Sequence, residues 1–75
     1  MGYRRDDRTE TFEGKIEHKA PKSYIVEFTL GGRYFVPISQ ITNLDDVLTN
    51  VDEDGNRVFE VTQWWWDKRH DFGAT

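Results

Sequence analysis

The alternation of apolar and polar residues predicts that this chain forms short β-strands. Residues 11–18 place every second side chain on one face, namely Phe12, Gly14, Ile16 and His18, which is the two-residue period of a half-buried strand. Residues 24–30 repeat that period. A turn is expected between the two strands, because Pro21 removes a backbone donor and restrains the residue before it.

A tight hairpin is predicted next, followed by a third strand. Gly31 and Gly32 supply the positive φ angles that short hairpin turns need, and the chain returns over residues 34–38. Because Pro37 cannot donate to a central ladder, this strand either lies at a sheet edge or ends there.

A second hairpin is expected later in the chain, with strands at 47–51 and 57–61 joined by an Asp-Gly turn. A loop or a single turn of helix precedes it over residues 39–46. Short strands with a turn about every eight to twelve residues are typical of small antiparallel folds. The predicted fold class is therefore mainly β: a small antiparallel barrel or a curved sheet of four to five strands, with one C-terminal helix.

The tryptophan-rich stretch near the end predicts that helix, at about 62–72. Thr62 suits its N-cap and Gly73 its C-cap. Trp66 would point away from the core, where it either staples the helix against Val61 or forms part of a contact surface. At about 100° per residue, the buried side would hold Val61, Trp64, Trp65, Lys68 and Phe72.

Composition limits the classes of protein to consider. The 75 residues include no cysteine, which excludes disulfides and cysteine-based zinc sites, while aromatic residues make up 15% and compensate for a small core. The net charge is −4, so a nucleic-acid binder would need a local basic patch. No apolar run approaches the ~20 residues of a membrane helix, and the expected location is cytoplasmic.

The domain organisation is expected to be simple. Residues 1–10, of which six are charged, are predicted to be a flexible tail. Residues 11–72 would form a single domain, and residues 73–75 would form a short second tail.

No combination of residues suited to catalysis or metal binding is found. The run "NVDEDG" (50–55) resembles the start of a calcium loop, but Val61 stands where that loop requires a glutamate. His18 and His70 lack metal-binding spacing. We expect no enzyme activity, no metal and no cofactor.

A binding role fits better, because cations and aromatic residues are interleaved on the first three strands. Barrels of the oligonucleotide-binding type combine cations that track phosphates with aromatic rings that stack on bases. Phe35 lies on the opposite face of its strand from Tyr34 and is expected to be the more exposed of the two. The candidate contact residues are Lys15, Lys22, Arg33, Tyr34, Phe35, Trp66 and Arg69.

Two stretches, "GGRYFVPISQI" (31–41) and "VFEVTQWWWDKR" (58–69), resemble a group of small uncharacterised proteins encoded by phages and other mobile elements. The shared features are an aromatic–hydrophobic–Pro–x–Ser–Gln–hydrophobic segment, here Phe35 to Ile41, and a strand that leads into a short Trp-containing helix. The resemblance implies an accessory role in replication, recombination or host takeover.

Two functions are compatible with these features. The first is a non-enzymatic module that binds nucleic acid, with a preference for single strands, and whose affinity should fall steeply with salt. The alternative is an acidic protein-binding modulator or inhibitor of a host or defence enzyme, whose carboxylates meet a basic surface. A homodimer through Trp66 is compatible with either function, and no membrane partner is expected.

Overall fold

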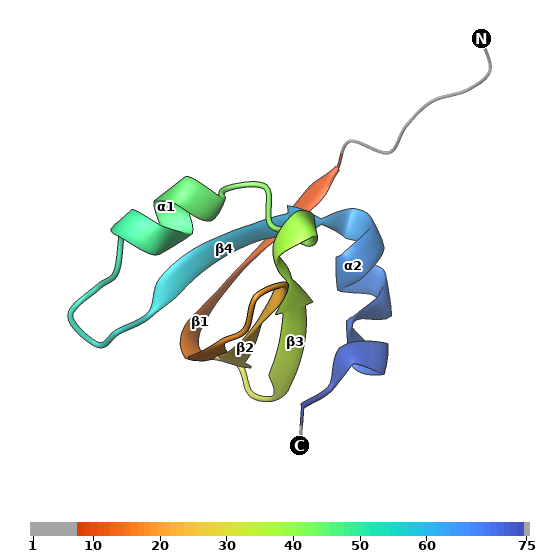
Figure 1. The fold of residues 1–75 in the computed structure, drawn as a ribbon, viewed down its shortest axis with the longest axis horizontal. Helices are drawn as coiled ribbons and strands as arrows, with labels where there is room; N and C mark the ends of the chain where they lie inside the picture. The colour runs from red at the N-terminus through yellow and green to blue at the C-terminus, as the bar shows by residue number, and fades with distance from the viewer. Residues whose placement is uncertain (1–7, 75) are drawn as a thin grey trace, which may run out of the picture.

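The computed structural model describes residues 8–74, whose strands form one antiparallel sheet (Figure 1). The strands are β1 (Thr9–Lys19), β2 (Ser23–Phe28), β3 (Arg33–Pro37) and β4 (Arg57–Thr62), in the order β3-β2-β1-β4. The sheet is curved but not closed, so the curved-sheet form of the prediction is confirmed. Of the tail predicted at 1–10, residues 1–7 lie outside the described residues, and β1 already includes Thr9 and Glu10.

Short helices connect and follow the strands. They are the 3₁₀ turn η1 (Ile38–Gln40), α1 (Leu44–Thr49), α2 (Gln63–Lys68) and the 3₁₀ turn η2 (Arg69–Phe72). The predicted strand at 47–51 is therefore wrong, and with it the second hairpin. Leu44 and Val47 are spaced for one face of a helix and pack on the core. Two aspartates in the first turn stabilise the helix, because its dipole is positive at the N-terminus.

The β2–β3 hairpin forms as predicted. Gly31 and Gly32 have φ angles of 113° and 94°, and Pro37 ends β3, which lies at the edge of the sheet. The register of β1 shifts between Ile16 and His18, so His18 pairs with Ile25 on the outer face of the sheet. The prediction that His18 shares the face of Phe12 is therefore wrong, because it assumed an uninterrupted two-residue period.

The core lies on the concave side of the sheet, under α1 and α2. Its fully buried side chains include Phe59, Trp65 and four valines. At Gly14 the backbones of β1 and β2 are close, since a Cβ there would lie 2.6 Å from the Glu27 carbonyl oxygen and 2.8 Å from the Val26 side chain. Glycine is therefore required at this position, opposite the last residue of β2.

Each outer edge of the sheet is covered in part by the chain itself. Beside β4, the Thr42 N–H donates to the Glu60 carbonyl (2.8 Å), and the Asn43 side chain accepts from the Glu60 N–H (2.8 Å) and donates to the Val58 carbonyl (3.0 Å). Beside β3, the Ala74 N–H donates to the Arg33 carbonyl (2.8 Å).

Gly73 serves this second edge rather than ending a helix. It forms an isolated bridge with Tyr34, and its φ of −63° is not the left-handed conformation of a helix C-cap. The predicted C-cap role of Gly73 is therefore wrong. Neither α1 nor α2, within the part of the chain that the structure describes, has the length and apolar character needed to cross a bilayer.

Candidate functional site

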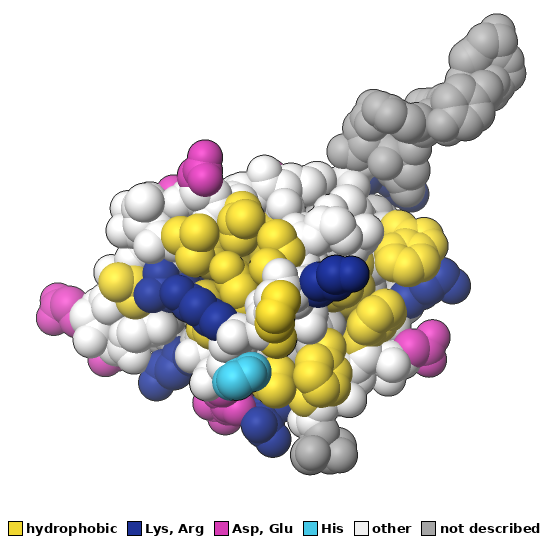
Figure 2. Space-filling view, in the orientation of Figure 1, with side chains coloured by type: hydrophobic (Ala, Val, Ile, Leu, Met, Phe, Trp, Pro, Cys, Tyr) yellow, Lys and Arg dark blue, Asp and Glu magenta, His cyan; other side chains and the backbone are white. Residues whose placement is uncertain are grey.

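The three consecutive tryptophans of α2 occupy three different environments. Trp65 is fully buried, Trp66 is partly buried against the core, and Trp64 is 53% exposed. The prediction that Trp64 belongs to the core and that Trp66 points away is therefore wrong. Figure 2 shows hydrophobic side chains at the surface over α2, and acidic side chains around the α1 end of the molecule.

The predicted buried face of the helix is displaced from the observed one by one residue. Thr62 is the N-cap as predicted, and its hydroxyl accepts from the Trp65 N–H at 3.2 Å. The helix lasts only six residues before it tightens into η2. Its buried side is therefore centred between Trp65 and Trp66, about 100° from the predicted centre between Trp64 and Trp65.

Trp66 packs on two phenylalanines of the sheet. Its ring centroid lies 5.7 Å from that of Phe12 and 6.1 Å from that of Phe28, and the planes of Phe28 and Trp66 differ by only 3°. Phe12 and Phe28 are themselves stacked at 4.1 Å. The other neighbour of the indole is Arg69, whose guanidinium lies 4.0 Å from the ring centroid and donates to the Trp66 carbonyl at 2.7 Å.

A shallow groove opens beside this aromatic cluster. We call it the β1 groove. It has a volume of about 420 Å³, and its walls come from β1, the end of β2, the following turn and α2. Its lining is mainly apolar and consists of Glu10, Thr11, Phe12, Glu13, Phe28, Thr29, Leu30 and Trp66.

The rim of the β1 groove combines exposed apolar surface with negative charge. Leu30 is 95% exposed at its mouth. Glu10 and Glu13 are the only charged residues among the described residues that line it. Arg69 lies beside Trp66, but its side chain is already bound to that residue's ring and carbonyl.

The β1 groove follows a stretch of β1 that β2 does not reach. β1 has 11 residues and β2 has six, and the paired register ends with Gly14 opposite Phe28. Beyond it, the Thr29 N–H still donates to the Glu13 carbonyl at 2.9 Å. Among the strands that the structure describes, residues 9–12 pair with β4 alone, on their other side. We call this stretch the free edge of β1.

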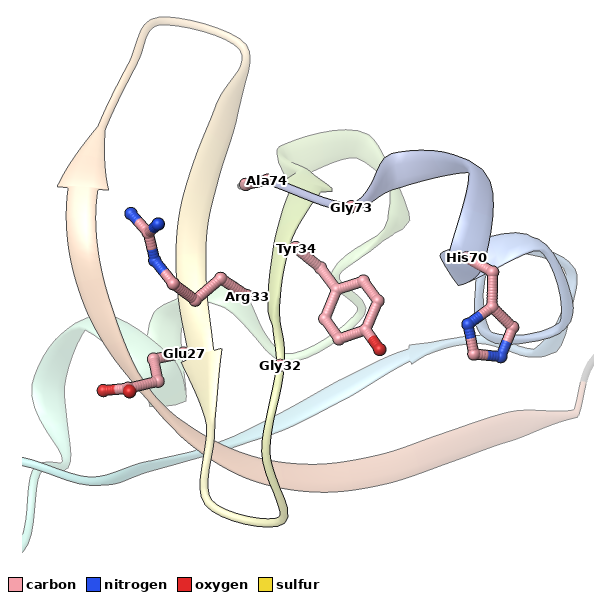
Figure 3. Close-up of a pocket in the computed structure, with 7 residues that line it drawn as sticks. All are labelled: Glu27, Gly32, Arg33, Tyr34, His70, Gly73 and Ala74. Atoms are coloured by element: carbon pink, nitrogen blue, oxygen red, sulfur yellow. The ribbon is translucent and has the colours of Figure 1, made fainter.

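The residues predicted to contact a nucleic acid do not form one surface. Successive residues of β3 alternate between faces, and Figure 3 shows Arg33 and Tyr34 leaving the strand in opposite directions. Tyr34 points toward His70, and the two ring centroids are 6.4 Å apart. Phe35 is 42% exposed and Tyr34 only partly so, as predicted.

The predicted phosphate contacts are dispersed among carboxylates. Arg33 forms an ion pair with Glu17 at 2.7 Å. Lys15 stands opposite Glu27 in the sheet. Lys22 is exposed in the connection between β1 and β2, far along the sheet from Trp66 and Arg69, which belong to the C-terminal helical segment.

A pocket of about 540 Å³ brings Arg33 and Tyr34 near the C-terminal segment. Its lining residues, drawn in Figure 3, are Glu27, Gly32, Arg33, Tyr34, His70, Gly73 and Ala74. This pocket holds one cation and one acid and is open to solvent. It contains two of the seven predicted contact residues and leaves the other five elsewhere.

The acidic turn that resembles a calcium loop is closed by its own backbone. The Asp52 carboxylate accepts from the N–H groups of Asp54 and Asn56, at 2.9 Å and 2.8 Å. Gly55 adopts a positive φ of 87°. Within residues 8–74, no group of three or more acidic, histidine or cysteine side chains is arranged to hold a metal ion.

Sequence reasoning missed most of the residues that line the β1 groove. The period of two places Leu30 at the end of the strand predicted at 24–30, directly before the two turn glycines. The same period places Phe12 and Phe28 on the faces of half-buried strands and does not indicate that they form the floor of a groove. No known protein family, curated protein or solved structure matches this chain.

Proposed function

We propose that this chain is a non-enzymatic protein-binding module that recognises a basic, apolar segment of its partner in the β1 groove. The observation that carries this proposal is the combination of an aromatic floor, an almost fully exposed leucine and two glutamates in one groove. Aromatic side chains in partly formed pockets are typical anchors of protein interfaces. The glutamates select for lysine or arginine beside the anchoring side chain.

Charge favours a protein over a nucleic acid at this position. The chain has a net charge of −4, and a phosphate backbone in the β1 groove would meet Glu10 and Glu13. A host protein as partner is also in line with the resemblance to proteins of phages and mobile elements.

Single-stranded nucleic acid is the second candidate, on a different surface. Phe35 is exposed on the outer face of the sheet, which Lys15 and Arg33 share with it. Stacking of a base on such a ring contributes about 1–3 kcal/mol. Binding there would weaken steeply as salt rises, because each phosphate contact releases counterions.

A peptide selection tests the proposal. A random peptide library is displayed and selected on the full chain, and the enriched peptides are then measured on the variant Leu30→Asp. We expect peptides that combine lysine or arginine with a large apolar residue, and a loss of affinity of at least about tenfold on the variant, or ~1.4 kcal/mol.

The matched control is Val51→Asp. Val51 is also an exposed apolar loop residue, at 50%, but it does not line the β1 groove. Enriched peptides that ignore Leu30→Asp would contradict the proposal. So would salt-sensitive binding of oligothymidine or oligouridine in the absence of any selected peptide, which would favour the second candidate.

A further inference from the structure

The free edge of β1 presents unpaired backbone groups to the β1 groove. In an antiparallel pair, a residue directs its N–H and C=O to the same side. Glu60, the partner of Thr11, directs both groups away from β1, to Asn43 and Thr42. Thr11 and Glu60 are therefore a non-hydrogen-bonded pair, and the Thr11 N–H and C=O point to the side on which β2 has already ended.

We infer that the partner segment binds as an added β-strand on the free edge of β1, antiparallel to β1 and in line with β2. This inference rests on the proposed function and specifies its binding mode. Strand addition supplies affinity through main-chain hydrogen bonds and specificity through pockets for alternate side chains. The free edge supplies main-chain groups for hydrogen bonds, and the β1 groove beside it supplies a pocket for a side chain.

The register gives the sequence pattern of the partner. Residues directly opposite each other in an antiparallel pair point to the same face. The partner residue opposite Phe12 therefore enters the aromatic floor formed by Phe12, Phe28 and Trp66. The residue opposite Glu10 meets that carboxylate, and the residue opposite Thr11 points to the outer face. Thr29 already occupies the place opposite Glu13, because its N–H donates to the Glu13 carbonyl. A basic partner residue just before the apolar one therefore lies near the Glu13 carboxylate without pairing with β1.

Because the added strand runs antiparallel, its paired stretch runs from the residue opposite Phe12 to the residue opposite Glu10, and one unpaired residue near Glu13 precedes it. Its expected pattern, from the N-terminal side, is basic, large apolar, any residue, basic. The third residue exchanges both of its main-chain hydrogen bonds with Thr11. The second residue turns its own N–H and C=O away from β1.

The experiment uses a blocked octapeptide with the central sequence Lys-Phe-Thr-Lys and Gly-Ser on both sides. Binding to the full chain is followed by NMR, and amide hydrogen exchange is measured with and without peptide. N-methylation of the peptide threonine should weaken binding about tenfold, because it removes a main-chain bond to Thr11. N-methylation of the peptide phenylalanine should leave Kd within about twofold, since that amide makes no bond to β1.

The protein side is tested with the same peptide. Exchange of the Thr11 amide should slow about tenfold or more at saturation, as expected for an amide that enters a ladder. Leu30→Ser should weaken binding, whereas Val51→Ser should not. The charge-reversed peptide Glu-Phe-Thr-Glu should not bind.

The outcomes separate this inference from the proposed function. If the peptide binds in a Leu30-dependent manner but both N-methylated forms bind equally and Thr11 exchange is unchanged, strand addition is wrong and the proposed function stands. If neither this peptide nor any selected peptide binds, both are wrong. If Thr11 is protected without peptide and the chain sediments as a dimer, a second copy fills the free edge, and the inference of a partner segment is overturned.

Discussion

The two outer edges of the sheet differ from the free edge of β1 in whether other parts of the chain form hydrogen bonds with them. Beside β4, Asn43 forms two hydrogen bonds through its side chain, and beside β3 the C-terminal segment pairs with Arg33 and Tyr34. Among residues 8–74, nothing pairs with residues 9–12 of β1 on the β2 side. An unpaired edge is a site for unwanted association, which proteins usually cover or charge.

Under the proposed function, the free edge of β1 is selective rather than unprotected. Leu30, Trp66 and the phenylalanines restrict which side chains fit beside it, and Glu10 and Glu13 restrict which charges do. At the covered positions of the outer edges, in Val58, Glu60 and Arg33, main-chain groups already hold a hydrogen bond within the chain.

The largest expected effect concerns the helix that forms one wall of the β1 groove. Trp65→Ala should lower the free energy of unfolding by about 3–5 kcal/mol, which is close to the whole stability of about 3–5 kcal/mol that a core of this size supplies. The variant should be largely unfolded by circular dichroism. Trp64→Ala, at a position 53% exposed, is the control and should unfold at nearly the wild-type urea concentration.

The size of this effect also explains why the unpaired indole N–H of Trp65 is tolerated. Its indole N–H is buried and has no hydrogen-bond partner among the described residues. An unpaired buried donor costs about 1–3 kcal/mol. The gain from packing is larger than that cost, so the position favours bulk over hydrogen bonding. A Trp65→Ala variant with wild-type stability would contradict this account.

A smaller effect is expected at the cover of β4. Asn43→Ala leaves the Glu60 N–H and the Val58 carbonyl without their partner and should cost about 1–3 kcal/mol in urea denaturation. Asn50→Ala is the matched control, because the Asn50 side chain donates only to the exposed Asp46 carboxylate. Equal stability of the two variants would show that Asn43 does not hold the edge.

The cover of β3 should contribute less. A chain that ends at Phe72 loses the Ala74–Arg33 hydrogen bond, with an expected cost of about 1 kcal/mol. Exposure of the β3 edge should also make association depend on concentration in sedimentation experiments. A chain lacking only Thr75 keeps the hydrogen bond and serves as control. A truncated chain that stays monomeric would indicate that this edge needs no cover.

The smallest effect is expected on the free edge itself. Thr11→Ala should change the free energy of unfolding by no more than about 0.5 kcal/mol, as for exposed positions generally. In the unbound protein the Thr11 amide should exchange much faster than that of Phe59, which is fully buried and pairs with Phe12. Slow exchange at Thr11 in a dilute, monomeric sample would mean that this edge is not free.

The strands were predictable and the helices only partly so. Periodicity of two identified the four strands, together with Pro21 between β1 and β2 and the paired glycines between β2 and β3. α1 was missed because Leu44, Val47 and Leu48 cover too few residues to separate a helical from a strand period. The orientation of α2 was wrong because packing on Phe12 and Phe28 sets it, and one residue of error rotates a helix by about 100°.

The β1 groove could not be predicted, because it arises from a mismatch in strand length. No property of Thr11 or Glu13 alone indicates that β2 stops at Phe28; only the register shows it. The predicted contact residues Arg33, Tyr34 and Phe35 were adjacent in sequence, and alternation along a strand separates adjacent residues onto opposite faces.

The strand order also determines when the sheet can be completed. β1 lies between β2 and β4, and its hairpin with β2 closes locally, yet Thr9 pairs with Thr62 near the other end of the described chain. Contacts this distant in sequence form slowly, since a long loop must close first. During synthesis, therefore, β1 lacks its partner on one side until β4 has left the ribosome.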